Sequence, residues 1–324
     1  MAATTTLLQT NCPDLRLIAR GKVRDIYEFP GDPSKLLFVA TDRISAFDVV
    51  MENGIPNKGK LLTQLSLFFF KKLEPIIPNH VVTGDFDQIL KHSSALLPYR
   101  DQLEGRTIFV KKCQVLKCEA IVRGYLTGQS HFDRPMRNTK NPEPYMGYRC
   151  RRACKNLASS RRQSLRPAPR RTWEPTTKTY IQINVTSPFH HSIHQMQEND
   201  EEQIKKKAIE IYEAAQGHCV GVGGGEGLLL ADTKLEFGLD EEGRLILIDE
   251  CLTPDSSRFW AREHWAPGIK MTGFDKQVLR DWLLSQHNHF DRSTPLQIPQ
   301  DVVLHTWAQY CQAFKLLTGN DFVP

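Results

Sequence analysis

The spacing of hydrophobic and polar positions changes several times along the chain, and each change marks an expected element. Alternation at 21–28 and 35–41 predicts two strands, joined by a turn at the Pro-Gly-Asp-Pro sequence of 30–33. The same reading predicts, in chain order, a helix at 61–73, a strand at 107–112, a mixed apolar and polar stretch at 115–126, strands at 228–237 and 244–249, and helices at 275–285 and 299–317.

A further helix is expected to begin near residue 199. Asn199 can cap this helix, and Glu202 then stands at its third position. One face carries apolar residues at helical spacing: Ile204, Ala208, Ile211, Tyr212 and Ala215. Because strands and helices do not alternate strictly along the chain, the order predicts an α+β fold rather than repeated βαβ units.

One basic window reverses the net charge of the chain. Residues 137–171 hold 11 of the 42 basic residues and one of the 37 acidic residues, a local balance of +10. The remainder carries −5, whereas the whole chain has a formal charge of +5. The window is rich in Arg, Ser and Pro and poor in branched aliphatic residues, so we expect it to be disordered. A nucleic-acid-binding tail is the alternative interpretation.

The remaining composition excludes several classes of protein. A hydrophobic content of 40% is that of a globular chain. No apolar run approaches the roughly 18 residues of a membrane span, and the amino terminus lacks the pattern of a secretory signal. The eight cysteines form no C-x-x-C pair, which favours reduced thiols over a metal site. We therefore expect a cytoplasmic protein with no membrane partner.

The hairpin near residue 240 carries the most informative polar pattern. A four-residue loop at 240–243 would pair Leu239 with Arg244 and Lys234 with Asp249, and would put Glu236 diagonal to Asp249. Period-2 alternation adds Asp232 to the same face. Two carboxylates can hold Mg²⁺ together with the phosphates of a nucleotide. A solvated face with cross-strand ion pairs is the alternative.

Four short segments combine a turn with cations or small polar residues, as anion-binding loops do: 21–24, 41–48, 58–60 and 250–258. Each segment also has an ordinary interpretation as an edge strand or a helix start. The glycine-rich stretch 221–227 does not match the dinucleotide fingerprint, because Glu226 occupies the third glycine position and a strand follows. We interpret that stretch as a linker.

Taken together, these segments resemble the SAICAR synthetase (phosphoribosylaminoimidazole-succinocarboxamide synthase) family. The motifs that carry the resemblance are GKVRDIYE (21–28), ATDRISAFDVV (40–50), IPNKGKLLTQLS (55–66), CEAIVRGYLTG (118–128), ADTKLEFG (231–238), IDECLTPDSSRFW (248–260) and QVLRDW (277–282). No single motif identifies the family, but the number of matching motifs and their order along the chain do.

The resemblance implies an ATP-dependent ligase of de novo purine biosynthesis. Such an enzyme joins the carboxylate of carboxyaminoimidazole ribotide (CAIR) to the amine of L-aspartate, giving SAICAR, ADP and phosphate. A carboxylate is a poor acyl donor, so ATP first converts it to an acyl phosphate. The implied fold has a small β-rich lobe at 1–113 and a larger α+β lobe at 114–324, with a kinase-like ATP cleft. ATP and Mg²⁺ are the implied cofactors, and nucleic acid is not an implied partner.

The resemblance also assigns roles to individual residues. Gly21, Lys22, Val23 and Arg24 would cover the ATP phosphates, and Glu236 and Asp249 would hold Mg²⁺, in agreement with the hairpin pattern. Lys234, Asp232 and Arg258 are the implied catalytic groups. The implied substrate-binding residues are Asp42, Arg43, Ser45, Asp48, Lys58, Gly59, Lys60, Arg123, Ser130, Asp255 and Ser256.

Residues 129–198 depart from the family pattern. An extra Gln129 precedes Ser130, and after Lys178 no acidic cluster follows where the family carries one. The composition changes abruptly at both ends, so we hypothesise that this segment comes from a shifted reading frame or a retained intron. Peptide mass spectrometry of the native protein is then expected to detect no peptides from 149–190. Abundant peptides from that range would refute the hypothesis.

Within the larger lobe we expect residues 129–198 to form a disordered basic insert. A catalytically impaired homologue that retains ATP binding is the alternative to an active ligase.

Overall fold

The computed structural model describes residues 6–125, 180–185, 198–222, 227–266, 271, 273–286 and 294–324 of the chain. The chain divides into two compact units, residues 1–125 with 179–324, and residues 126–178. All described residues belong to the first unit. None of their helices has both the length and the apolar composition that a membrane crossing requires.

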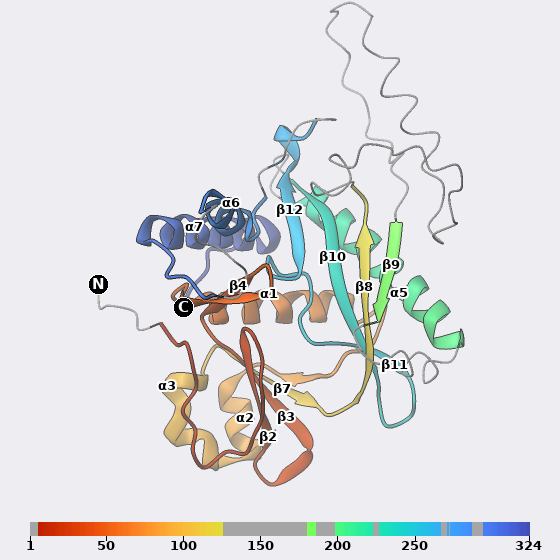
Figure 1. Ribbon diagram of the computed structural model, residues 1–324. Coiled ribbons are helices and arrows are strands. Elements are labelled where there is room, and N and C mark those ends of the chain that lie inside the picture. The colour runs from red at the N-terminus through yellow and green to blue at the C-terminus, as the bar shows by residue number, and fades with distance from the viewer. Residues whose placement is uncertain are drawn as a thin grey trace, which may run out of the picture. The chain divides into compact units, whose positions relative to one another are not determined.

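The first sheet is antiparallel and has the strand order β1-β2-β3-β7-β6 (Figure 1). Its strands are β1 (Leu17–Arg20), β2 (Arg24–Phe29), β3 (Asp32–Ala40), β7 (Thr107–Lys111) and β6 (Val81–Thr83). Helix α2 (Phe86–His92), the 3₁₀ helix η1 (Ser94–Tyr99) and helix α3 (Arg100–Leu103) pack on it. The shared core includes Leu37, Ile89, Leu96 and Phe109, all buried.

The second sheet is built around one long strand, β10 (Leu228–Leu239). The other strands are β11 (Leu245–Ile248), β8 (Gln114–Arg123), β9 (Tyr180–Val185) and β12 (Ser257–Ala261). Figure 1 shows β10 between β12 and β8, with β9 on the far side of β8. Three helices share its core: α1 (Lys58–Leu73), α5 (Glu198–Gly221) and α7 (Gln300–Thr318).

A smaller layer completes the described fold. The hairpin of β4 (Arg43–Ala46) and β5 (Val49–Gly54) packs on α6 (Gln277–Ser285) and on the start of α7. A single 3₁₀ turn, η5 (Arg262–His264), follows β12. These elements are the mixture of helices and antiparallel strands that the sequence predicts for an α+β fold.

Two helix starts differ from the predicted ones. Helix α1 begins at Lys58 rather than at Leu61, because Asn57 takes a left-handed φ of 63° and turns the chain into the helix. Gly59 fits there because an added Cβ would lie 2.3 Å from the Ala40 carbonyl oxygen. Helix α5 begins at Glu198, so the prediction that Asn199 caps it is wrong. The predicted apolar face of α5, from Ile204 to Ala215, is buried as expected.

The predicted register of the β10–β11 hairpin is wrong by one residue. Leu239 pairs with Leu245, and Glu236 pairs with Ile248. Asp240 and Arg244 close a three-residue loop in which Gly243 has a φ of 74°. This is a type I turn followed by a left-handed residue, one of the common hairpin connections. Lys234 therefore does not pair with Asp249, which follows the last paired residue of β11.

A bulge in β10 decides which side chains face the helices. Leu228 and Leu230 belong to the helix-facing core, but after the irregularity between Leu230 and Asp232 that core takes Leu235 and Phe237 instead. One inserted residue reverses the alternation of a strand. Asp232, Lys234 and Glu236 consequently share the opposite face, as the sequence predicts.

The expectation of disorder over 129–198 fails at its carboxyl-terminal end. Tyr180–Val185 forms β9, which pairs antiparallel with β8. Residues 129–179 and 186–197, including the basic window, lie outside the described residues. The lobe boundary after residue 113 stays a prediction. It separates the two sheets, but Leu65 and Phe69 of α1 share a core with Tyr310 and Phe314 of α7.

Candidate functional site

Asp232 lies at the centre of a row of three charged residues on neighbouring strands. In the sheet register it stands opposite Arg123 of β8 on one side and Arg258 of β12 on the other. Arg258 donates two hydrogen bonds to its carboxylate, at 2.8 and 2.6 Å, and Arg123 Nε lies 3.5 Å from Oδ2. The register of three strands thus brings together residues that are more than 100 positions apart.

Lys234 lies two residues further along β10 between two carboxylates. Its Nζ is 2.7 Å from Glu236 and 3.0 Å from Glu119, which β8 places opposite Glu236. Burial alone would lower the pKa of Lys234, but the two glutamates outweigh it and raise that pKa. Lys234 is therefore held as a cation, and its two partners keep it on the face it shares with Asp232.

Glu236 and Asp249 lie close enough for their charges to interact. Burial, together with the charge of Asp249, raises the pKa of Glu236. Burial would do the same to Asp249, but Arg24 and Lys234 reverse the effect and lower its pKa. Asp249 has a left-handed φ of 68°, which turns the chain where β11 ends. The acidic pair survives the corrected register because that turn, rather than strand pairing, positions Asp249.

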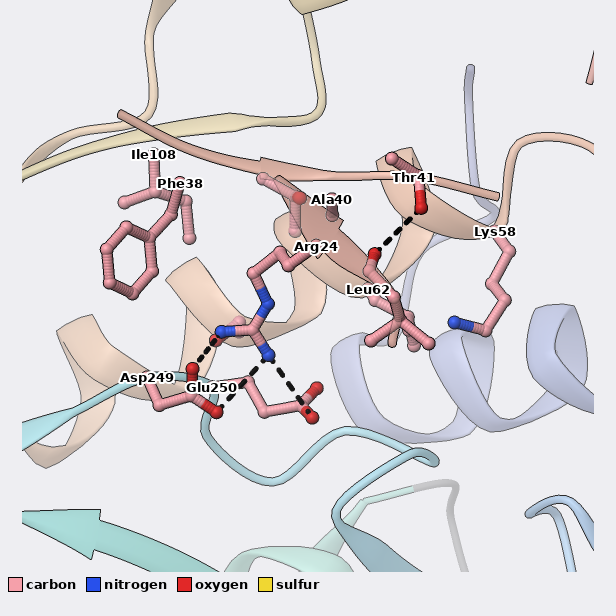
Figure 2. A pocket seen from close by; sticks show the side chains of 12 residues that line it. Arg24, Phe38, Ala40, Thr41, Lys58, Leu62, Ile108, Asp249 and Glu250 are labelled. Carbon is pink, nitrogen blue, oxygen red and sulfur yellow. Dashed lines mark hydrogen bonds and ion pairs between the residues drawn. The ribbon is translucent and has the colours of Figure 1, made fainter. Parts of the chain in front are cut away.

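Arg24 links the first sheet to this acidic pair. Figure 2 shows its guanidinium directed at Asp249 and Glu250, with two hydrogen bonds to Asp249 and an ion pair to Glu250 at 3.4 Å. Arg24, Asp249 and Lys58 line a cavity of about 30 Å³ whose apolar wall includes Phe38. An anionic ligand that carries its own cation could replace the carboxylate partners of Arg24.

A second cavity of about 150 Å³ is lined by three guanidinium groups. Arg123 and Arg258 reach it from the sheet, and Arg280 reaches it from α6. Arg280 donates to Asp275 at 2.6 Å. Lys234 lines the same cavity. Guanidinium groups match the geometry of phosphate and carboxylate oxygens, so this cavity suits an anion.

Lys58 and Asp255 connect the two cavities. Lys58 lines the first cavity and Asp255 the second, and Lys58 Nζ lies 2.8 Å from Asp255 Oδ2. Lys276 Nζ approaches the same oxygen at 3.0 Å, and the Tyr310 hydroxyl donates to the other at 2.7 Å. Burial would raise the pKa of Asp255, but the two lysines hold it far below its usual value. Asp255 is therefore a buried anion that forms ion pairs with two cations, Lys58 and Lys276.

Several predicted residues line these cavities. Val23, Arg24, Lys58 and Asp249 line the first. The second is lined by Arg123, Asp232, Lys234, Asp255, Ser256 and Arg258. Glu236 lines neither cavity, but it accepts a hydrogen bond from Lys234, which lines the second cavity. Ser130 lies outside the described residues.

Asp42 and Arg43 are held by other groups of the protein. Both are buried, and neither lines the first or the second cavity. Asp42 accepts hydrogen bonds from the Leu7 and Gly59 amides and from Arg106. Their predicted contact with substrate stays a prediction, and in this structure both side chains bind protein partners.

Six further predicted residues lie away from the walls of these two cavities. Asp48 is exposed and forms an ion pair with Lys22 of the 21–24 loop. Ser45 and Lys60 line neither cavity, and Gly59 contributes its amide to Asp42. Gly21 closes the loop with a hydrogen bond to the Arg24 carbonyl.

Sequence reasoning missed Arg280, Lys276 and Tyr310. All three lie in the helical region that begins after Gly273, and each contacts an aspartate of the site. The QVLRDW motif contains Arg280, so the resemblance carried a signal for it. Lys276 and Tyr310 stand alone in ordinary helical patterns, where only the fold could pair them with Asp255.

Comparison with known proteins shows the family to which the chain is similar. The SAICAR synthetase family model matches residues 17–296. The phosphoribosylaminoimidazole-succinocarboxamide synthase of Thermodesulfovibrio yellowstonii is 40% identical over 318 residues, which cover 97% of this chain and 99% of the relative.

Two solved structures share the fold. The SAICAR synthase of Saccharomyces cerevisiae in complex with SAICAR is 35% identical, with a TM-score of 0.73 over 98% of this chain and 100% of that one. A SAICAR synthetase (Type-2) in complex with ADP has a TM-score of 0.58 at 20% identity, over 94% and 99% of the two chains. The chain therefore belongs to the SAICAR synthetase family, the ATP-dependent ligases that its ordered motifs predict.

Proposed function

We propose that this protein ligates L-aspartate to the carboxylate of CAIR at the expense of ATP, giving SAICAR, ADP and phosphate. The observation that carries the proposal is the pair of cavities joined by Lys58 and Asp255. In the first cavity the cation Arg24 faces the carboxylates of Asp249 and Glu250. The second cavity is lined by the guanidinium groups of Arg123, Arg258 and Arg280. A reaction that transfers a phosphoryl group between two anionic substrates needs two neighbouring anion sites.

The first cavity is our candidate for the nucleotide phosphates. The 21–24 loop borders it, and Arg24 supplies a cation there. The bound ADP of the Type-2 relative supports a nucleotide in this family fold. Glu236 and Asp249 fit a magnesium ion, because they are two neighbouring carboxylates, the oxygen donors that this ion prefers, and the charge of Asp249 helps to raise the pKa of Glu236. When bound, the ion would neutralise charge on the phosphates.

The second cavity is our candidate for the ribotide. Arg123, Arg258 and Arg280 can bind its phosphate and carboxylate oxygens, and Asp232 keeps two of these guanidinium groups in place. Ser256 adds a hydroxyl to the same wall. The SAICAR bound to the yeast relative, which is 35% identical, supports a ribotide product at this site.

The chain's own residues act by position and charge. Lys58 lies between the two cavities, where the γ-phosphoryl group would pass from ATP to the CAIR carboxylate, and its charge stabilises the transferring oxygens. Lys234 serves the acceptor side, where the acyl phosphate forms and the aspartate amine attacks. The amine loses a proton, the amide bond forms, and phosphate leaves.

An assay of ADP release tests the proposal directly. Purified full-length protein with Mg-ATP is expected to release ADP only when both CAIR and L-aspartate are present. ADP release without aspartate would indicate that the acyl phosphate forms but is hydrolysed. No ADP release with both substrates would contradict the ligase and leave an inactive relative.

Nucleic-acid binding through residues 137–171 is the alternative and is not favoured. The family match accounts for the motifs of the chain, whereas the basic window contributes none of them. Binding to DNA that weakens steeply with salt and disappears when 137–171 is deleted would support that alternative.

A further inference from the structure

The guanidinium of Arg43 forms an unusually complete set of contacts with the 21–24 loop. Its Nη2 donates to the carbonyl oxygens of Gly21 at 2.9 Å and Arg24 at 3.1 Å, and its Nε donates to that of Lys22 at 3.1 Å. Arg43 itself is only 8% exposed. A single buried side chain thus binds three of the four carbonyl groups of the loop.

The fourth carbonyl group is held by a neighbour of Arg43. The amide of Thr41 donates to the Val23 carbonyl at 3.0 Å, and the Thr41 hydroxyl donates to the same oxygen at 2.9 Å. All four carbonyl oxygens of the loop therefore accept hydrogen bonds from the segment that follows β3. Among the described residues, the amides of Lys22 and Val23 donate no hydrogen bond.

A buried carboxylate fixes the guanidinium in turn. Asp25 is fully buried and accepts from Arg43 at 2.8 Å, from the Thr10 hydroxyl at 2.6 Å and from the Thr10 amide at 3.1 Å. Arg20 lies 3.3 Å from the same carboxylate oxygen as Arg43. The loop is thus anchored through Arg43 to β2 and to the segment before β1.

We propose that Arg43 is a positioning residue that orients the 21–24 loop for nucleotide phosphates, an inference that rests on the proposed function of that loop. Carbonyl oxygens repel phosphate oxygens, whereas amide groups attract them. Arg43 and Thr41 turn the carbonyl groups inward, so the free amides of Lys22 and Val23 are available to an anion. Arg43 acts without touching the ligand.

The Arg43→Lys variant separates charge from geometry. Lysine can keep the ion pair with Asp25, but its ammonium cannot reproduce the fixed fork of a guanidinium that serves several carbonyl groups. We expect affinity for ADP with Mg²⁺, measured by titration calorimetry, to fall about tenfold, the effect of losing roughly one or two hydrogen bonds. The KM values for CAIR and aspartate should stay within about twofold.

Arg106→Lys is the matched control. Arg106 is 4% exposed, pairs with the fully buried Asp42 and donates to the Ala40 carbonyl, but makes no bond to the loop. We expect a similar loss of thermal stability with ADP affinity unchanged. Equal losses of affinity in both variants would overturn the inference, as would unchanged affinity in Arg43→Lys.

Thr41 provides a milder pair of variants should Arg43→Lys fail to fold. Thr41→Val removes the hydroxyl bond to Val23 and keeps the shape of the side chain, whereas Thr41→Ser keeps the bond. We expect ADP affinity to fall about threefold in the first and to be unchanged in the second. Equal affinities would overturn the inference.

Lys22→Ala distinguishes failure of the inference from failure of the proposed function. It removes an exposed cation from the loop without changing the carbonyl bonds. If Lys22→Ala weakens ADP binding but Arg43→Lys does not, the loop contacts nucleotide and only the positioning role is wrong. If neither variant weakens binding, or the wild-type chain binds no ADP, the nucleotide role of the loop fails and the inference fails with it.

Discussion

Asp249→Asn is expected to lower turnover about a thousandfold while the protein remains folded. Removing one preorganised charge from the centre of a phosphoryl-transfer site costs roughly a hundredfold to a thousandfold. The fold should tolerate the change, because Arg24 keeps an ion pair with Glu250 at 3.4 Å. The measurements are kcat in the ADP-release assay and the melting temperature, with the Mg²⁺ concentration varied. Half-maximal activity should require more Mg²⁺ than in the wild type.

The same substitution elsewhere on the hairpin is the control. Asp240 lies in the loop, where its Oδ1 accepts hydrogen bonds from the Glu242 and Arg244 amides. Asparagine keeps an oxygen for these bonds, so Asp240→Asn should retain turnover within about twofold. Wild-type turnover in Asp249→Asn would refute the metal role.

Glu236→Gln separates the metal role of Asp249 from its role as partner of Arg24. The carboxylate of Glu236 bonds to Lys234 rather than to Arg24. A magnesium site shared by both carboxylates predicts a raised Mg²⁺ requirement in both variants. A raised requirement in Asp249→Asn alone would assign the effect to the loss of the Arg24 partner.

The face of β10 could be predicted from the sequence, whereas the hairpin register could not. Alternation alone places Asp232, Lys234 and Glu236 together, and the bulge occurs before the first of them. The register depends on whether Gly243 closes a three-residue or a four-residue loop, and the residues Asp-Glu-Glu-Gly allow both. The prediction that Glu236 and Asp249 are neighbours is unaffected, because the left-handed turn at Asp249, and not the strand register, positions that residue.

Polar residues that follow a strand were harder to assign. Asp42 and Arg43 have the composition of a ligand loop, yet their partners are Arg106 and Asp25. Arg106 is 64 positions from Asp42, so no local pattern reveals that pair. The sequence shows which residues can bind an anion, and only the tertiary fold shows which of them are already occupied. Of residues 58–60, Lys58 alone lines one of the two cavities described above.

Lys58→Met is expected to lower kcat about a hundredfold, the effect of losing one preorganised charge at the transferring group. Lys276→Met is the matched comparison, because both ammonium groups contact Oδ2 of Asp255, at 2.8 and 3.0 Å, and both side chains are at least nine-tenths buried. Only Lys58 lines the cavity that also holds Arg24.

Both variants remove one of the two cations around a buried carboxylate, so both should lower the melting temperature by a similar amount. Each keeps the other lysine and the Tyr310 hydroxyl as partners of Asp255. If Lys58 acts only by compensating Asp255, the two variants should lose turnover equally. A loss of turnover confined to Lys58→Met, at matched loss of stability, would instead locate the transferring phosphoryl group between the two cavities.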